Sequence, residues 1–252
     1  MQAEERQFLI EQHLQKVEFA SLEELSEKVD VSVSTVRRDL TLLETKGTIR
    51  RTHGGARLVT PKSDEFAFTA RDTHQLSEKD AIGQAAAALV QPNQGVIVDA
   101  GTTAYHVAKH LGGKASHIIT NSLPVANHFG SDNSVEVLVT GGVIYPRLGV
   151  LVGPLAAESL SKMHADVAIM SGGGITMDGI TNSHALLIDI QLAMLQSAQR
   201  IIFCLDHTKF NRRSVSPLCE LDAIDTIVTD AQAPADLVGQ LKQTNTQVVI
   251  AS

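Results

Sequence analysis

Two short amphipathic helices followed by a basic hairpin are encoded near the amino terminus of this 252-residue chain. The second helix has apolar residues at three- and four-residue spacing, namely Val33, Val36, Leu40 and Leu43. This spacing places them on one face of a helix with about 3.6 residues per turn. Ser32 suits the N-cap and Gly47 suits a stop, so the pattern predicts a helix that begins near Val33 and buries one side.

A preceding helix is predicted by the same spacing, which recurs at Leu22, Leu25 and Val29. Ser21 and Glu24 stand three residues apart at its start, which is the capping-box pattern. Only a few residues separate the two helices, so together they predict a helix-turn-helix unit. An earlier helix over residues 4–15 would supply the third member of a small core.

Polar residues on the outer side of the second helix, and the hairpin after it, indicate contact with DNA. A step of about 100° per residue puts Arg38 almost opposite the apolar stripe and Arg37 nearer its edge. Arginine pairs well with guanine, so we expect Arg38 to contact base edges. The alternative is that both arginines are solvated charges on a structural helix. The residues expected to contact DNA are Ser32, Ser34, Thr35, Arg37, Arg38, Thr41, Arg50, Arg51, His53, Gly54 and Gly55.

The positive charge of the chain is concentrated in this stretch. Residues 31–62 carry seven basic side chains against two acidic ones, whereas residues 1–30 carry three against eight. The whole chain has a formal net charge of −7. General acidity argues against indiscriminate binding to nucleic acid, and a local basic face is typical of a docked DNA-binding module.

The rest of the chain predicts a larger α/β domain. Apolar periodicity lapses around Pro61 to Asp64, and we expect a winged helix-turn-helix domain over residues 1–58, a linker over 59–76 and a second domain over 77–252. Beyond the linker, strands alternate with helices, which favours a mostly parallel sheet covered on both faces. The predicted strands are residues 95–100, 117–120, 135–140, 167–171, 200–205, 226–229 and 247–251.

Five of these predicted strands end in small or polar residues. Ligands of open α/β sheets bind outside the carboxyl ends of the strands, so these ends predict one binding site. Backbone amides at the start of the helix after Gly101 suit a phosphate, Asp99 and Asp206 suit sugar hydroxyls, and Lys209 suits a negative charge. The expected effector-binding residues are Asp99, Gly101, Thr102, Thr103, Asn121, Ser122, Gly141, Gly142, Gly172, Gly173, Asp206 and Lys209.

Each of these signals has a plainer interpretation. Gly-Thr-Thr before a helix is ordinary capping, and the paired glycines at 141–142 and 172–174 are compatible with tight turns. Lys209 is compatible with a surface lysine. Their convergence on one edge of the predicted sheet is what favours a ligand site.

The sequence also resembles a known family, the DeoR family of bacterial transcriptional regulators. The residues that match its helix-turn-helix signature are Ser32, Thr35, Val36, Arg37, Arg38, Asp39, Leu40, Leu43, Arg51, Gly54, Gly55 and Ala56. Phe68, Arg71, Ser77, Glu78, Lys79 and Ile82 fit the family's linker and following helix, and the resemblance continues to the Asp-His-Thr-Lys-Phe stretch at 206–210. It implies a sensor domain similar to ribose-5-phosphate isomerase and effectors that are typically phosphorylated sugars.

One stretch departs from the family pattern. Family members commonly have a Leu-Glu-Ala-Glu-like sequence before a Lys-Arg pair, whereas residues 187–192 here read Leu-Ile-Asp-Ile-Gln-Leu. Asp189 keeps one acidic position and the basic pair is absent. This helix therefore suits either an apolar subunit contact or a ligand with fewer hydroxyl groups.

Composition excludes several other classes. No apolar run approaches the roughly 20 residues that span a bilayer, and the polar amino terminus is no signal peptide, so we expect a cytoplasmic protein. No cofactor is expected, and no metal either. His106 and His110 stand four apart on a predicted helix, and with no third ligand nearby we interpret both as surface histidines.

Three functions fit these observations. The first is a transcriptional regulator, most simply a homo-oligomeric repressor of carbohydrate-metabolism genes, that binds operator DNA and responds to a sugar phosphate. The second is a sugar-phosphate isomerase-like enzyme with an attached DNA-binding module, using Asp99 or Asp206 as base and Lys209 as an electrostatic aid. The third is a DNA-binding protein whose sensor pocket has decayed into a scaffold.

Overall fold

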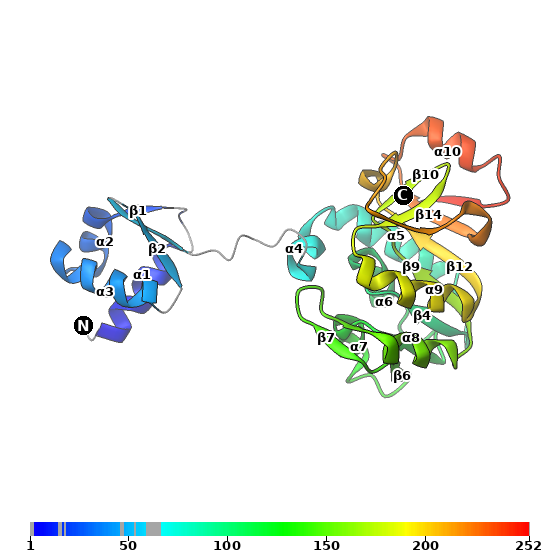
Figure 1. Ribbon diagram of the computed structural model, residues 1–252, viewed down its shortest axis with the longest axis horizontal. Helices are drawn as coiled ribbons and strands as arrows, with labels where there is room; N and C mark the ends of the chain where they lie inside the picture. Colours follow the sequence, from blue (N-terminus) through cyan, green and yellow to red (C-terminus); the bar gives the residue numbers. More distant parts are fainter. Residues whose placement is uncertain are drawn as a thin grey trace. The chain divides into compact units, whose positions relative to one another are not determined.

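The chain divides into two compact units, residues 1–65 and residues 66–252 (Figure 1). A computed structural model describes residues 3–14, 17, 19–45, 48–52, 54–58 and 67–251. Gly47, His53 and the breaker cluster at 61–64 therefore lie outside the described residues, as do the side chains of Arg50 and Leu58.

The first unit is a three-helix core with a small antiparallel sheet. Its elements are α1 (Ala3–Leu14), β1 (Ala20–Ser21), α2 (Leu22–Val29), α3 (Val33–Thr45), β2 (Ile49–Thr52) and β3 (Gly55–Leu58). The strand order is β1-β3-β2, and β2 and β3 form the hairpin of the wing. The predicted winged helix-turn-helix is confirmed, and Val36, Leu40 and Leu43 are each buried in its core as their spacing required.

Side-chain caps fix the two helices of the helix-turn-helix. The Ser21 hydroxyl accepts a hydrogen bond from the Glu24 amide at 3.1 Å, which caps α2. This helix ends at Asp30, whose φ of 48° lies in the left-handed region that asparagine and aspartate tolerate better than most residues. The Ser32 carbonyl accepts the first bonds of α3, from the amides of Thr35 and Val36. The turn between the helices is thereby closed by local bonds.

A buried ion pair ties α1 to α3. The carboxylate of Asp39 is almost fully buried, and the Arg6 guanidinium donates to it through Nε at 2.5 Å and through Nη2 at 3.1 Å. Gln7 Nε2 lies 3.3 Å from the same carboxylate. The residues of the Arg-Arg-Asp-Leu motif thus have different roles. Arg37 and Arg38 are exposed, whereas Asp39 holds α1 against α3.

The second unit contains a seven-stranded sheet in which every neighbouring pair is parallel. The strand order is β15-β14-β12-β9-β4-β5-β6. The strands are β4 (Gly95–Val98), β5 (His117–Thr120), β6 (Glu136–Val139), β9 (Ala165–Met170), β12 (Ala198–Cys204), β14 (Thr226–Asp230) and β15 (Gln247–Ala251). All seven predicted strands belong to this sheet, which confirms the predicted α/β class.

Helices cover both faces of the sheet (Figure 1). They are α5 (Leu76–Ala88), α6 (Thr102–Lys109), α7 (Leu123–Phe129), α8 (Pro154–Ser161), α9 (Ile188–Gln196) and α10 (Ala235–Leu241). Successive residues of β4 point to opposite faces and show which helices cover each face. Val96 and Val98 belong to the cluster with α5, α6 and α7, and Ile97 belongs to the cluster with α8, α9 and α10. Burial on both faces explains the continuous apolar runs of the strands.

Several short elements escaped the sequence analysis. They are α4 (Phe68–Thr73), the hairpin of β7 (Val143–Tyr145) and β8 (Val150–Val152), the small sheet of β10 (Gly174–Thr176), β11 (Gly179–Asn182) and β13 (Ser216–Cys219), and 3-10 turns at Ala185–Leu187, His207–Lys209 and Leu221–Ala223. Three or four residues carry too few repeats for a periodic signal. Helix α4 lies inside the stretch for which we expected a linker. Within the described chain, no helix is long and apolar enough to cross a membrane.

The glycines of the wing allow a direct test of its packing. A Cβ on Gly55 would lie 2.1 Å from the Ala20 carbonyl oxygen, which is backbone and cannot rotate away, whereas a Cβ on Gly54 meets no described atom within 4 Å. We expect Gly55→Ala to cost about 1–3 kcal/mol of stability and Gly54→Ala much less. Calorimetry of the first unit's transition measures the difference, and equal unfolding temperatures would contradict this packing.

The Asp39 ion pair gives a second stability test. Asp39→Asn keeps the shape of the side chain but removes the charge that faces the Arg6 guanidinium, so we expect the first unit to unfold several degrees lower, at about 4–8 °C per kcal/mol. Asp30→Asn is the matched control, because Asp30 is exposed and its positive φ suits asparagine. Hydrogen exchange at α1 amides reports the change, and faster exchange in both variants alike would argue against the pair.

Candidate functional site

The outer face of α3 presents the residues that were predicted to contact DNA. Ser34, Arg37 and Arg38 are exposed, and Thr35 is partly exposed. The Ser32 hydroxyl lies 2.9 Å from the Ser34 hydroxyl and 3.0 Å from that of Thr35. The amino-terminal turn of α3 is therefore a compact group of hydroxyls, with two arginines one turn further along. Hydroxyls, guanidinium groups and a helix amino terminus are all suited to phosphates and base edges.

The wing is clamped to α3 by Arg51. Its backbone amide donates to Glu44 Oε1 at 2.9 Å, and its Nε lies 3.2 Å from Glu44 Oε2. Its Nη1 donates to the Thr41 hydroxyl at 2.5 Å. Both charged side chains are more than a third exposed, so the pair adds little stability but does orient β2 against the helix. Sequence analysis did not give Glu44 this role.

The two glycines in the turn of the wing, Gly54 and Gly55, have different roles. Gly54 is exposed, and its carbonyl accepts the Leu22 amide at 3.0 Å, which joins the wing to the start of α2. Gly55 is buried against the Ala20 backbone, so its lack of a side chain serves packing. His53 and the side chain of Arg50 lie outside the described residues, and their predicted contacts with DNA stay predictions.

The predicted effector residues follow five adjacent strands of the sheet. In the order β12-β9-β4-β5-β6 these strands run parallel, so the residues after each of them lie along one edge. Their surroundings nevertheless differ. Some of these residues form a polar network at the middle of the edge, and others bond to neighbouring loops.

A carboxylate network occupies the middle of the edge. Asp99 Oδ2 accepts hydrogen bonds from the Ser171 hydroxyl, from the Ser171 amide at 3.1 Å and from Gln191 Nε2 at 3.1 Å. Asn182 Nδ2 donates to Gln191 Oε1 at 2.7 Å. Burial raises the pKa of Asp99, and these bonds oppose that shift. Asp99 therefore joins β4, β9 and α9. One oxygen of the carboxylate that we expected to accept sugar hydroxyls, Oδ2, already has three donors.

Gly101 and the glycines after β9 are fixed by close packing. A Cβ on Gly101 would overlap the Ser171 hydroxyl, and one on Gly172 would lie 2.8 Å from Ile180. Gly173 faces the hydroxyls of Ser183 and Ser214, 2.9 and 2.7 Å from where a Cβ would stand. These residues let the loops after β4 and β9 approach one another. Thr102 and Thr103 follow at the buried amino terminus of α6.

The loops after β5 and β6 turn instead toward the β7–β8 hairpin. Asn121 Nδ2 donates to the Leu151 carbonyl at 3.0 Å, and the Ser122 hydroxyl caps α7 by accepting the Val125 amide. The Asn121 Oδ1 atom is buried without a hydrogen-bond partner among the described residues. Gly142, with a φ of 114°, packs against the Val152 carbonyl, and Gly141 has a φ of 70°. Gly141, Gly142 and Ser122 thus have structural roles, whereas Asn121 keeps one unused acceptor.

A cationic cluster lies beside the end of β12. Lys79 Nζ is buried and donates to the carbonyls of Arg71 and His74, the latter at 2.6 Å. Burial lowers the pKa of Lys79 to about 8, against an opposing effect of Asp206. Lys209 Nζ lies 3.9 Å from Asp206 Oδ2, and burial lowers the pKa of Lys209 as well. Asp206 Oδ1 accepts the Thr208 amide at 3.0 Å.

The sequence analysis therefore found part of this edge. Asp99 and Gly101 meet at Ser171, and Asp206 meets Lys209. The charges of the two groups also interact. Burial lowers the pKa of Arg71 and Asp99 opposes that shift, while Arg71 adds to the effect of burial in lowering the pKa of Lys209. The residues that it did not assign to the site are Arg71, Lys79, Ser171, Asn182 and Gln191. Ser171 was within reach, because it is the last residue of a predicted strand.

The interpretation of His106 as a surface residue was wrong. His106 is 2% exposed, and its Nε2 lies 3.3 Å from Asp72 Oδ1. Burial lowers the pKa of His106, and so does the Lys109 charge, while Asp72 opposes the shift. Helix α4 supplies Asp72 and buries this face of α6, which the sequence could not show because α4 itself was not predicted. Among the described residues, no group of His, Cys, Asp and Glu side chains is arranged to hold a metal ion.

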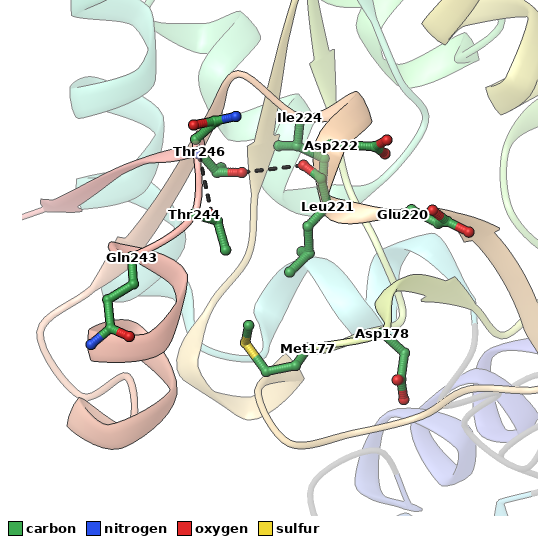
Figure 2. Close-up of a pocket in the computed structure, with 10 residues that line it drawn as sticks. Met177, Asp178, Glu220, Leu221, Asp222, Ile224, Gln243, Thr244 and Thr246 are labelled. Carbon is green, nitrogen blue, oxygen red and sulfur yellow. Dashed lines mark hydrogen bonds between the residues drawn. The ribbon is translucent and has the colours of Figure 1, made fainter.

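The sensor unit also has a cavity of about 780 Å³ at the opposite edge of the sheet. It is lined by residues just before β14 and β15 and by Met177 and Asp178 of the β10–β11 turn. Figure 2 shows the Thr246 hydroxyl donating to the Leu221 carbonyl in its wall, at 3.2 Å. The charged residues of the lining are Asp178, Glu220 and Asp222, so this cavity has the wrong sign of charge for a phosphorylated ligand.

Comparisons with known proteins agree with both units. Residues 6–62 match the DeoR-like helix-turn-helix domain, and residues 74–231 match the DeoR C terminal sensor domain. The chain is 34% identical to the HTH-type transcriptional regulator GolR of Listeria innocua, over 90% of this chain and 91% of GolR. It is 34% identical to the HTH-type transcriptional repressor GlcR of Bacillus subtilis, over 94% and 93%. The L-fucose operon activator of Haemophilus influenzae is 31% identical, over 92% and 93%.

Two solved structures resemble the fold more remotely. Ribose 5 phosphate isomerase A from Neisseria gonorrhoeae has a TM-score of 0.36 and 14% identity, covering 56% of this chain and 54% of the isomerase. The delta subunit of eIF2B from Chaetomium thermophilum has a TM-score of 0.44 and 14% identity, covering 82% and 74%. The family matches, by contrast, extend through both the helix-turn-helix and the sensor unit, and they place the chain in the DeoR family of transcriptional regulators.

Proposed function

We propose that this protein represses carbohydrate-metabolism genes and that a phosphorylated sugar changes its affinity for operator DNA. The observation that carries the DNA-binding half is the exposure of Arg37 and Arg38 on α3, opposite a buried apolar stripe. Membership of a regulator family supports it. Among the relatives, GlcR is named a repressor and the L-fucose protein an operon activator, and repression is the sign that we propose here.

The effector half of the proposal is supported by chemistry at the carboxyl edge of the sheet. The amino terminus of α6 offers backbone amides at Thr102 and Thr103, which suit a phosphate. Lys79 and Lys209 supply positive charge nearby, and the buried Oδ1 atom of Asn121 supplies an acceptor for a hydroxyl group. We assign Asp99 to holding Ser171 and Gln191 in place, since its Oδ2 atom is fully engaged. That engagement also leaves it poorly placed to act as a base, and the family relatives are regulators.

The proposed mechanism couples the two units. We propose a winged-helix domain over residues 1–58, a connection over 59–76 and a sensor over 77–252, in a homo-oligomer that binds paired operator half-sites. A metabolite that prefers one arrangement of the sensors would shift the spacing of the DNA-binding units and so change operator affinity. Leu186 lies just before the stretch that departs from the family pattern and Leu192 lies at its end, and both exposed side chains suit a contact between sensors.

The assignment of Arg38 to base recognition is tested against its neighbour. After the operator has been selected from random duplex DNA, we expect Arg38→Ala to weaken operator binding roughly tenfold to a hundredfold while hardly changing binding to unrelated DNA. Arg37→Ala is the matched control, expected to weaken both kinds of DNA alike because it contacts phosphates. Fluorescence anisotropy at fixed salt measures both affinities. An unchanged ratio of specific to non-specific affinity in Arg38→Ala would contradict the assignment.

The effector site is tested by combining Thr102→Val with Lys209→Ala in the full chain. We expect this double variant to bind the operator normally and to lose its response to glucose 6-phosphate, fructose 6-phosphate or fructose 1-phosphate, whichever acts on the unmodified protein. Lys242→Ala, an exposed change at the end of α10, is the control and should respond normally. Survival of the response in the double variant would move the effector site elsewhere.

A further inference from the structure

Helix α4 is the first described element after residues 59–66, which join it covalently to the DNA-binding unit. It has six residues, and none of them is fully buried within the described chain. Its N-cap residue, Ala67, provides no side-chain hydrogen bond. A helix this short has little stability of its own. Its position therefore depends on its contacts with the sensor unit.

Among the described residues, most of the contacts of α4 lead to α6. The Phe68 amide donates to the Arg147 carbonyl at 3.1 Å, and the Phe68 ring packs edge-on against Tyr105 with 5.4 Å between centroids. Asp72 faces the buried His106. Tyr105 and His106 both belong to α6, the helix whose amino terminus forms part of the proposed effector site. Lys79 of α5 then holds the carboxyl end of α4 through two carbonyls.

Two residues of α4 have a buried polar atom without a hydrogen-bond partner among the described residues, Arg71 at Nε and Asp72 at Oδ1, and of these Arg71 is the cation. Its Nε atom is buried and has no hydrogen-bond partner among the described residues. A donor that has lost water without gaining an acceptor costs free energy, and a charged donor costs more. The carboxylates that act on Arg71 electrostatically are Asp99 and Asp72, and neither bonds to its Nε atom. Asp99 Oδ2 accepts from Ser171 and Gln191, and Asp72 Oδ1 faces His106.

The charges of the residues around Arg71 are also unbalanced. Lys79 and Lys209 lie close enough to Arg71 that each has its pKa lowered by the guanidinium charge. Four cations, these three and Arg212, thus interact with three aspartates, Asp72, Asp99 and Asp206. Among these groups the positive charges outnumber the negative ones by one, and a bound anion would balance them.

We propose that Arg71 binds the anionic group of the effector and that the resulting fixation of α4 carries effector occupancy to the DNA-binding unit. The proposal rests on the proposed effector site. A phosphate monoester carries nearly two negative charges at neutral pH and matches the two-pronged geometry of a guanidinium group. Its binding completes the hydrogen bonding of Arg71 and adds a contact to α4. The ligand thereby favours the docked position of α4 over undocked ones, which is the differential affinity that a switch requires.

The test compares Arg71→Gln with the unmodified full-length protein, using as probe the hexose phosphate that releases the unmodified protein from its operator. We expect Arg71→Gln to bind operator normally, to bind the probe roughly tenfold to a hundredfold more weakly, and to stay on DNA. Hydrogen exchange at α4 amides should slow on addition of probe in the unmodified protein and change little in the variant. Arg213→Gln is the matched control, because Arg213 is exposed and pairs with the exposed Asp178.

The possible outcomes test the proposed effector and the proposed role of Arg71 separately. If no phosphorylated sugar acts on the unmodified protein, the proposed effector is wrong. If one acts and Arg71→Gln binds it as tightly as the unmodified protein, the role of Arg71 is wrong. If binding weakens but a saturating concentration still releases the variant from DNA, Arg71 binds the ligand without carrying the signal. Arg71→Lys keeps the charge without the planar fork and, should Arg71→Gln not fold, must show the same loss in weaker form.

Discussion

Parallel strands set the main constraint on this protein, because they bring the ends of five β-strands to one edge of a sheet. A buried carboxylate then joins the loops at the centre of that edge. Asp99 binds Ser171 of the neighbouring strand end and Gln191 of a helix that lies far along the sequence. Without these bonds the carboxylate would be costly to bury, and with them it determines where the loops stand. The amino terminus of α6 follows directly from Asp99, so its position depends on the same network.

Much of this architecture followed from the sequence. The strands after Gly95 and His117 were predicted because long apolar runs between breakers leave few alternatives, and α3 was predicted because a stripe and a cap agree. Helix α4 and the β7–β8 hairpin were missed because their short segments owe their structure to tertiary contacts. The burial of His106 was missed for the same reason, since the helix that covers it leaves no periodic signal.

The candidate site shows a different limit of prediction from sequence. Strand ends were found by their polarity, yet polarity does not reveal which groups are already bonded to one another. Ser122 serves as a helix cap and Asp99 as a brace, both by hydrogen bonds that join segments distant in sequence. Arg71 and Lys79 were visible as part of a family pattern, but their approach to the strand edge depends on how α4 and α5 pack. Side-chain partners are a property of the tertiary structure, and sequence spacing predicts them only within single elements.

The pairing of Arg51 with Glu44 has a consequence for how the wing meets DNA. In the free protein this arginine already has a carboxylate and a hydroxyl as partners. A DNA phosphate can bind the Arg51 guanidinium group only in competition with the Glu44 carboxylate. The backbone amide of Arg51 itself holds that carboxylate in place. Glu44 thus cancels part of the attraction between Arg51 and DNA phosphates, at specific and non-specific DNA sites alike. We therefore expect an arginine restrained in this way to add little to non-specific binding, and the exposed arginines of α3 to supply most of the discrimination between DNA sequences.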